Sequence, residues 1–103
     1  MAAKTLITAA TGAATSDRFN IMIVGGETQT IVGYGMSAGD TIDLQISHDD
    51  GTTFNDHYEN GDQTQLTSTN TTLTFATPGI FRLNKGATTG TAGAVLYLNR
   101  EVN

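Results

Sequence analysis

The chain has 103 residues, no Cys, 38% hydrophobic residues and a formal net charge of -5. This length fits one domain, the absence of Cys excludes disulfides and thiolate metal sites, and the acidic balance disfavours nucleic-acid binding, which needs clustered Lys and Arg. No apolar run approaches the roughly 20 residues of a membrane helix or the roughly 7–15 of a signal peptide, so we expect neither.

Apolar and polar residues alternate along much of the chain. In a strand, successive side chains point to opposite faces, so such alternation predicts strands with one buried face. Thr makes up about a fifth of the residues and, being β-branched, suits a pleated surface. In chain order, we expect strands near residues 4–8, 18–24, 28–34, 41–47, 53–58, 63–67, 71–76, 80–84 and 94–100.

The same alternation predicts which side chains form the core. The apolar members of four predicted strands share one face in each case. We expect the core to contain Phe19, Ile21, Ile23, Ile42, Leu44, Ile46, Leu73, Phe75, Phe81 and Leu83.

Turn signals separate the predicted strands at intervals of about 8–12 residues. Asp50-Gly51 and Asn60-Gly61 favour tight turns because their residues tolerate positive φ. The only Pro, Pro78, lies in another turn, and residues 90–93 read as a flexible hairpin tip. Together these features predict an all-β chain, a single-domain antiparallel β-sandwich (jelly-roll-like) of about 8 strands.

The first 15 residues carry few bulky apolar side chains. After Met1 these are Leu6 and Ile7, followed by a run of Ala, Thr and Gly. We therefore expect residues 1–15 to form an N-terminal arm beside a sandwich domain of residues 16–103, with Lys4, Thr5, Leu6, Ile7 and Thr8 making contacts with another chain by strand addition. The alternative is an ordinary first strand of the same sandwich.

The chain contains residue types that form catalytic sites in other proteins. Ser47-His48-Asp49 has the residue types of a catalytic triad, but consecutive side chains on a strand point apart and cannot meet. Paired acids can hydrolyse glycosides, yet such sites need an aromatic-lined cleft, and the chain has no Trp and only three Tyr. We expect no enzyme, no catalytic residue and no cofactor.

The segment from Asp49 to His57 is the strongest metal candidate. Oxygens of Asp49, Asp50 and Asp56 could bind Ca²⁺, and His48 and His57 could join a transition-metal site. The spacing lacks the regular D-x-D-x-D-G pattern and its closing Glu, and a hairpin turn explains the Asp-Asp-Gly run without a metal. We expect no metal site.

Charge is unevenly distributed along the chain. The basic residues Lys4, Arg18, Arg82, Lys85 and Arg100 flank a stretch from Phe19 to Phe81 that has none. Acidic residues concentrate between Asp40 and Asp62. The ends of the chain can still pack beside its middle, so this pattern does not by itself predict a charge separation in space.

Several motifs resemble those of a known class of proteins. They are Thr5-Leu6-Ile7-Thr8 with the small-residue stretch 9–16, Ala38-Gly39-Asp40-Thr41-Ile42-Asp43-Leu44-Gln45-Ile46-Ser47, Asp49-Asp50-Gly51-Thr52-Thr53-Phe54, and Pro78-Gly79-Ile80-Phe81-Arg82-Leu83-Asn84-Lys85-Gly86 with Gly93-Ala94-Val95. Together they resemble small accessory virion proteins of tailed bacteriophages, which decorate or cement the capsid.

This resemblance implies a non-enzymatic structural protein on the capsid exterior, present in the host cytoplasm before assembly. The implied partners are the major capsid protein and further copies of the chain, with a homotrimer favoured because capsid sites have rotational symmetry. The subunit or capsid contacts are expected at Lys4, Thr5, Leu6, Ile7 and Thr8. No nucleic acid or membrane partner is implied. The alternative is a small carbohydrate-binding or tail/fibre-associated β-sandwich module.

Overall fold

The computed structural model describes residues 2–21, 29–59, 61–75 and 79–98, with the backbone alone at Ala2, Ile21, Phe75 and Leu98. Within these ranges every regular element is a β-strand. No helix there is long and apolar enough to cross a membrane. The all-β prediction is confirmed.

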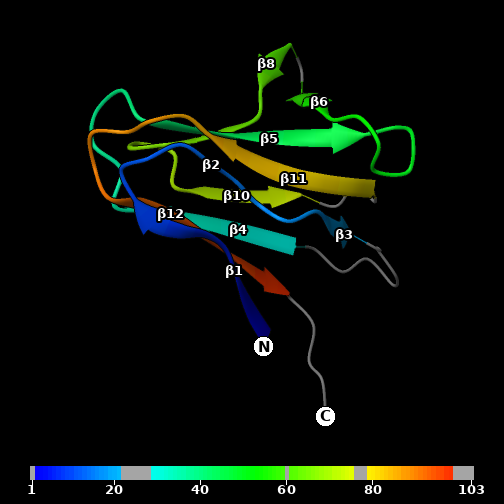
Figure 1. Ribbon diagram of the computed structural model, residues 1–103, viewed down its shortest axis with the longest axis horizontal. Coiled ribbons are helices and arrows are strands. Elements are labelled where there is room, and N and C mark those ends of the chain that lie inside the picture. Colours follow the sequence, from blue (N-terminus) through cyan, green and yellow to red (C-terminus); the bar gives the residue numbers. More distant parts are fainter. Residues whose placement is uncertain (1, 22–28, 60, 76–78, 99–103) are drawn as a thin grey trace.

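One layer of the molecule, here called sheet A, contains four antiparallel strands and lies in the lower half of Figure 1. Their spatial order is β1-β12-β4-β10. Their bounds are Ala2–Ala10 for β1, Ala92–Leu98 for β12, Gln29–Tyr34 for β4 and Thr72–Phe75 for β10.

The other layer, sheet B, is built around a central antiparallel pair, β11 (Gly79–Lys85) and β5 (Thr41–Ser47). Two short strands, β2 (Ala14–Thr15) and β3 (Phe19–Ile21), pair with the outer side of β11. Two more, β6 (Asn55–Asp56) and β9 (Gln65–Thr67), pair with the outer side of β5.

The strand connections make this sandwich a jelly roll. Strands β2 and β3 share one position beside β11, and β6 and β9 share one position beside β5. Counted in this way, the described part of the two sheets has eight strand positions. Numbered along the chain, sheet A reads 1-8-3-6 and sheet B reads 2-7-4-5. This is the order of a jelly roll, in which two Greek keys share two facing sheets. The predicted sandwich of about 8 strands is confirmed, although short breaks divide it into twelve elements.

A small hairpin interrupts the edge of sheet B. Strands β7 (Tyr58–Glu59) and β8 (Asp62–Gln63) pair only with each other among the described residues and stand away from the sandwich at the top of Figure 1. The predicted strand near 53–58 is thus split into β6 and β7. Gly61, in the turn between β7 and β8, has φ 84°, as its predicted turn role requires.

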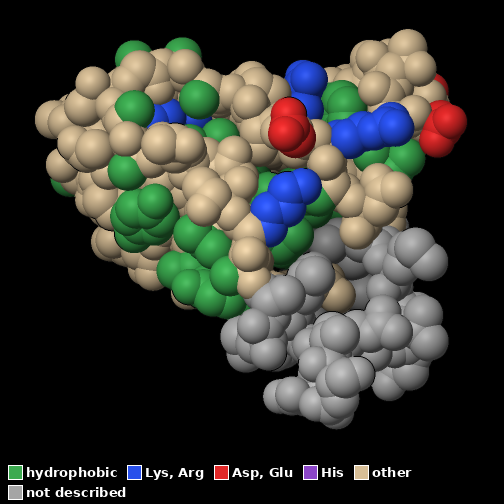
Figure 2. All heavy atoms as spheres, turned by 60° about the horizontal axis from the view of Figure 1, so that its bottom comes forward, with side chains coloured by type: hydrophobic (Ala, Val, Ile, Leu, Met, Phe, Trp, Pro, Cys, Tyr) green, Lys and Arg blue, Asp and Glu red, His purple; other side chains and the backbone are tan. Residues whose placement is uncertain are grey.

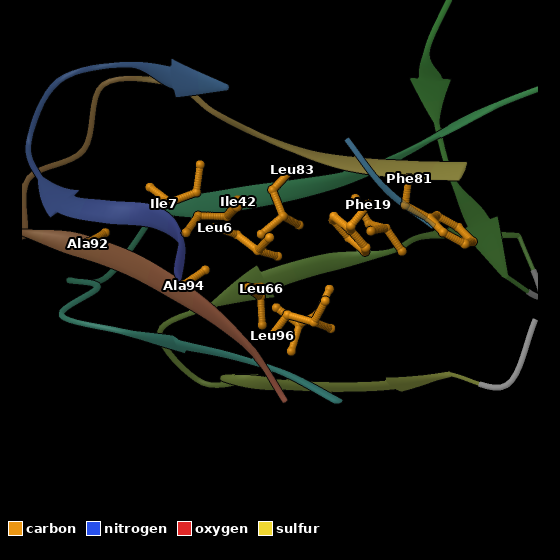
Figure 3. Packing of buried hydrophobic residues seen from close by; sticks show 12 residues of the cluster. Leu6, Ile7, Phe19, Ile42, Leu66, Phe81, Leu83, Ala92, Ala94 and Leu96 are labelled. Atoms are coloured by element: carbon orange, nitrogen blue, oxygen red, sulfur yellow. The ribbon is translucent and has the colours of Figure 1, made fainter. Parts of the chain in front are cut away.

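The core lies between the two sheets (Figure 3). Five predicted members are buried, namely Phe19, Ile42, Leu44, Phe81 and Leu83. Ile46 and Leu73 are partly buried against them. Ile23 and the side chains of Ile21 and Phe75 lie outside the described part of the molecule. The prediction is therefore confirmed where the structure describes the residues.

Seven further apolar residues complete the core, Leu6, Ile7, Ile31, Leu66, Ala92, Ala94 and Leu96. Leu6 and Ile7 are neighbours, yet both are buried. The pairing of β1 with β12 shifts register between Thr5 and Ile7, and such a bulge turns two consecutive side chains toward one face.

The structure supports the first-strand alternative for the start of the chain. Residues 2–10 form β1, which pairs with β12 along its length, and residues 14–15 form β2 in sheet B. The exposed fraction of Ile7 is 1%. Residues 1–15 are therefore not a separate arm in their described part, because β1 and β2 belong to the two sheets of the sandwich.

The flexible hairpin tip expected around residues 90–93 is wrong. Strand β11 belongs to sheet B and β12 to sheet A, so residues 86–91 cross from one sheet to the other. Gly93 lies inside β12. The glycines sit there because two backbones approach closely: a Cβ on Gly90 would lie 2.1 Å from the carbonyl oxygen of Gly35.

Replacing Ile7 by Ala tests whether β1 stabilises the domain. Because this side chain is fully buried, Ile7→Ala should lower the free energy of unfolding by about 2–5 kcal/mol, measured by urea denaturation. Thr8→Ala, at an exposed position of the same strand, should change it by less than about 0.5 kcal/mol. Equal and small effects would show that β1 is dispensable for the fold.

Candidate functional site

The Asp-Asp-Gly run in the acidic segment forms the predicted turn. The amide of Thr52 donates to the carbonyl of Asp49 at 3.4 Å, and the two residues between them, Asp50 and Gly51, have φ 61° and 87°. Positive φ at both central positions is the property for which Asp-Gly turns are selected. The guanidinium Nη1 of Arg18 donates to the Asp50 carbonyl at 3.0 Å, so a basic residue from early in the chain does pack beside the acidic middle.

The Asp49 carboxylate organises this turn. Its Oδ1 accepts bonds from the hydroxyl of Ser47 and the backbone amide of Thr53, both at 2.8 Å. Hydrogen bonds from the Thr53 side chain and backbone, and then from Ser47, lower the pKa of Asp49 to about 2. The oxygen that would serve a metal therefore already has partners within the turn.

The other candidate ligands are held apart from Asp49. Asp56 accepts a bond from Nε2 of Gln45 at 3.0 Å on the outer face of sheet B. His48 is exposed, whereas His57 Nδ1 lies 2.8 Å from the hydroxyl of Thr64 and its ring packs edge-on to Phe81. Among the described residues no three His, Asp or Glu side chains are placed to hold a metal ion.

The Ser47-His48-Asp49 sequence has a structural use instead. The Ser47 hydroxyl donates to Asp49 and accepts the amide of Gly51 at 2.8 Å, so it closes the turn after β5. In this triplet the serine bonds directly to the aspartate and the exposed histidine stands outside that bond. This is not the order of contacts that activates a serine nucleophile.

A buried lysine lies at the end of β11 and the start of β5, away from the Asp49 turn. The exposed fraction of Lys85 is 1%. Its Nζ donates to the carbonyl of Ala10 at 2.5 Å and to the carbonyl of Ala92 at 3.1 Å. One ammonium group therefore joins the end of β1, the end of β11 and the start of β12.

A buried aspartate completes the same cluster. Oδ1 of Asp40 accepts the amide of Thr89, and its Oδ2 accepts the amides of Gly90 and Ser37, all at 2.9 Å. Bonds from the amides of Thr89, Gly90 and Ser37 lower the pKa of Asp40, and the positive charge of Lys85 adds to them. We call these contacts of Lys85 and Asp40 the Lys85–Asp40 network.

The sequence interpretation missed this network. Lys85 continues the alternation of Phe81 and Leu83, so its position on the inward face was visible in the sequence. Asp40 follows Gly39, which has φ 88° in the turn before β5, and this turn signal alone gives no sign of burial. Buried Lys and Asp are uncommon unless they are paired or hydrogen-bonded, as both are here.

The outer face of sheet B carries two cross-strand rows of polar side chains. In one row Arg82 Nε donates to Gln45 at 2.7 Å, and the Arg82 guanidinium lies 4.5 Å from the ring centroid of Phe54. In the other row Gln65 donates to Asp43 at 2.7 Å. These polar groups bond to one another across the strands.

The outer face of sheet A is different. Register places Thr5, Val95, Val32 and Thr72 in one row across all four strands. A second row contains Ala3, Tyr97, Thr30 and Thr74. The intervening residues of the central strands, such as Ile31 and Leu96, point into the core, so these rows face outward. We call these eight residues the uncharged face.

A tyrosine extends the uncharged face along β4. Tyr34 pairs with Gly93, and a Cβ on Gly93 would lie 2.7 Å from the tyrosine hydroxyl oxygen. The ring of Tyr34 therefore lies across the glycine, which leaves 43% of the residue exposed. In Figure 2 apolar side chains gather left of centre on the side nearest sheet A, while acidic side chains lie in the upper half.

Acidic charge is segregated in space as well as in sequence. Among the described residues every Asp and Glu lies in sheet B, its hairpin or the connections, and the strands of sheet A carry one charge, that of Lys4. In the part of the chain that the structure describes, the strands of sheet A are therefore almost free of charge.

The five residues predicted to make contacts all lie in β1, at one edge of sheet A. Lys4, Thr5 and Thr8 are exposed. Leu6 and Ile7 are buried in the core, so their side chains face the domain's own interior. A contact with a partner stays a prediction for the exposed three and for the outer backbone of β1.

Comparisons with known proteins identify no relative: no family model, no curated protein and no solved structure matches the chain.

Acid should destabilise the fold through Asp40 and Asp49. Both have a folded-state pKa below the unfolded value of about 3.9, so their stabilisation is present above that pH and is lost as the pH falls through the lowered pKa of each group, which is about 2 for Asp49. The melting temperature, followed by circular dichroism, should fall between about pH 4 and 2. Asp49→Asn should show a smaller fall than wild type. Asp50→Asn is the control, because the carbonyl and not the side chain of Asp50 bonds Arg18; an identical loss in both variants would contradict the assignment.

Removing the Lys85 ammonium group should weaken the closed end of the sandwich. Lys85→Met keeps most of the side-chain volume but leaves the carbonyls of Ala10 and Ala92 without this donor. The free energy of unfolding should drop by about 1–3 kcal/mol in chemical denaturation. Lys4→Met, at an exposed position, should have little effect. A Lys85→Met variant as stable as wild type would mean that the network is not needed for stability.

Stability should not depend on divalent metal. Because Asp49, Asp56 and His57 each bond to a different partner and His48 is exposed, neither EDTA nor millimolar Ca²⁺ or Zn²⁺ should shift the melting temperature appreciably. A drop of many degrees in EDTA would instead reveal a metal site in the acidic segment.

Proposed function

We propose that the chain is a non-enzymatic virion structural protein that binds the outside of a phage capsid and reinforces its lattice. The observation that carries the proposal is a jelly-roll sandwich whose chemically suggestive groups are engaged in its own turns and cross-strand rows, while an uncharged face stays open to contact. The sequence resemblance to decoration proteins supplies the capsid as partner.

The energetic basis of this function is mass action. A protein that binds the assembled lattice but not the free capsid subunits stabilises the lattice by its binding free energy, about 2.7 kcal/mol per site at a free concentration ~100 times its dissociation constant. Such a role needs no catalytic group, but it needs a stable domain and a surface that fits its neighbours.

The fold suits a protein made in a reducing cytoplasm. It has no Cys to oxidise, and its crossing connections are fastened by the Lys85–Asp40 network instead of disulfides. A net charge of -5 favours solubility before assembly. Capsid symmetry favours a closed oligomer, and a trimer fits a three-fold position.

The capsid contact is proposed for the exposed part of β1. Among the described residues this strand lies at the edge of sheet A with no strand on its outer side, where an added strand could pair with its backbone. Lys4, Thr5 and Thr8 offer their side chains there. Thr5 also belongs to the uncharged face, so the two contact surfaces adjoin at this edge.

The test is to separate heads, tails and free protein from a phage lysate that produces the chain, and to quantify the chain by mass spectrometry. We expect it in the head fraction in a fixed ratio to the major capsid protein. Heads stripped of the chain should rupture at a lower temperature, and adding purified chain should restore their resistance. Absence from heads would contradict the proposal.

A second candidate is a carbohydrate-binding or tail/fibre-associated module. It is favoured by Tyr34, whose hydroxyl end lies over Gly93 and which is 43% exposed, because an exposed aromatic ring can stack on a sugar ring. Recovery of the chain with tails, together with glycan binding that Tyr34→Ala abolishes, would support this candidate over capsid decoration.

A further inference from the structure

We propose that the uncharged face of sheet A is the surface through which copies of this chain associate with one another. The occupant is a second copy, packed against Val32, Val95 and Tyr97 at the centre of the face. That copies of the chain associate rests on the proposed function, which expects a homo-oligomer. The surface through which they associate is inferred from the structure alone.

The electrostatics of the chain favour this face over every other described surface. Each copy carries a net charge of -5, so two copies repel when their acidic surfaces approach. Asp43 and Asp56 lie on the outer face of sheet B, and Glu59 and Asp62 lie on its hairpin. The strands of sheet A bring no carboxylate to the contact, so copies that meet there keep their acidic surfaces apart.

The chemistry of the two outer faces points the same way. On sheet B the polar side chains already bond to one another, as Gln45 does to both Arg82 and Asp56, and covering them would remove water from charged groups. On sheet A the central residues Val32, Val95 and Tyr97 are only half-buried within one copy. Covering them releases water from apolar surface, which favours association.

The geometry is compatible with closed symmetry. The two rows cross all four strands of sheet A, so the face is broad, and it repeats identically on every copy. Turned toward a two-fold axis, this face meets the same face of a second copy. Turned toward a three-fold axis, its two halves meet different parts of the same face on two neighbours. Thr residues at the ends of the rows can hydrogen-bond across such a contact.

The experiment introduces carboxylates at the ends of one row. Thr5 and Thr72 are exposed, so Thr5→Glu/Thr72→Glu should fold normally, as checked by melting temperature. The matched control, Thr15→Glu/Asn20→Glu, adds the same charge at exposed positions of sheet B. Mass is measured by light scattering after size exclusion and by sedimentation velocity across a wide concentration range.

We expect wild type and control to be oligomeric and the sheet A variant to dissociate, with its dissociation constant raised at least ~100-fold because like charges meet in the contact. Raising the salt concentration to 1 M should strengthen association of wild type, since it screens repulsion between acidic copies. If the double variant melts earlier than wild type, Thr72→Glu alone on the edge strand β10 gives the same test.

Three results would overturn the inference: a wild-type chain that is monomeric at all concentrations, a sheet A variant that stays oligomeric, or equal dissociation of variant and control. Failure here is distinguishable from failure of the capsid role. A chain that assembles in solution but is absent from heads contradicts only the capsid proposal, whereas a monomer that binds heads contradicts only this one.

Discussion

The Lys85 ammonium group and the Asp40 carboxylate hold together three of the connections that cross between the sheets at one end of the sandwich. In this jelly roll every pair of successive strand positions except the fourth and fifth lies in opposite sheets, so most connections cross an open end of the core and leave backbone groups that need partners. Lys85 supplies a donor to the carbonyls of Ala10 and Ala92, and Asp40 supplies acceptors to the amides of Ser37, Thr89 and Gly90. The core itself is small and contains two alanines, Ala92 and Ala94, where larger domains place bulky residues. The closed end therefore depends on charge-assisted hydrogen bonds as well as on apolar packing.

The outer faces of the two sheets differ in charge. Sheet B, its hairpin and the connections carry all the acidic residues of the described part, and two of them, Asp43 and Asp56, accept hydrogen bonds from glutamines in cross-strand rows. Sheet A presents Val, Thr, Tyr and Ala and one lysine at its edge. The carboxylates of sheet B favour solubility, whereas the outer face of sheet A can be covered by a partner without burying an unpaired charge. This division of labour suits a protein whose task is to occupy a place in an assembly.

Much of the fold could be predicted from the sequence because strand periodicity is local. The alternation of Ile42 and Leu44, or of Phe81 and Leu83, identifies both the strand and its buried face. The strand at the start of the chain is harder to predict, because a bulge buries the neighbours Leu6 and Ile7 and so breaks the period of two. The glycines after Lys85 predict a hairpin tip, because nothing local in the sequence indicates to which sheet the next strand belongs. The uncharged face depends on which strands become neighbours, and that is decided by long-range pairing.

The central claim is that the chain works through the outer face of sheet A, and its three tyrosines report on this directly. Tyr34 and Tyr97 lie on that face, whereas Tyr58 stands on the hairpin of sheet B with 59% of its surface exposed. Hydroxyl-radical footprinting with mass spectrometry measures the accessibility of each ring in the dilute chain and in its assembled form. The account predicts that assembly protects Tyr34 and Tyr97 and leaves Tyr58 reactive. Protection of Tyr58 with no change at Tyr34 and Tyr97 would contradict it.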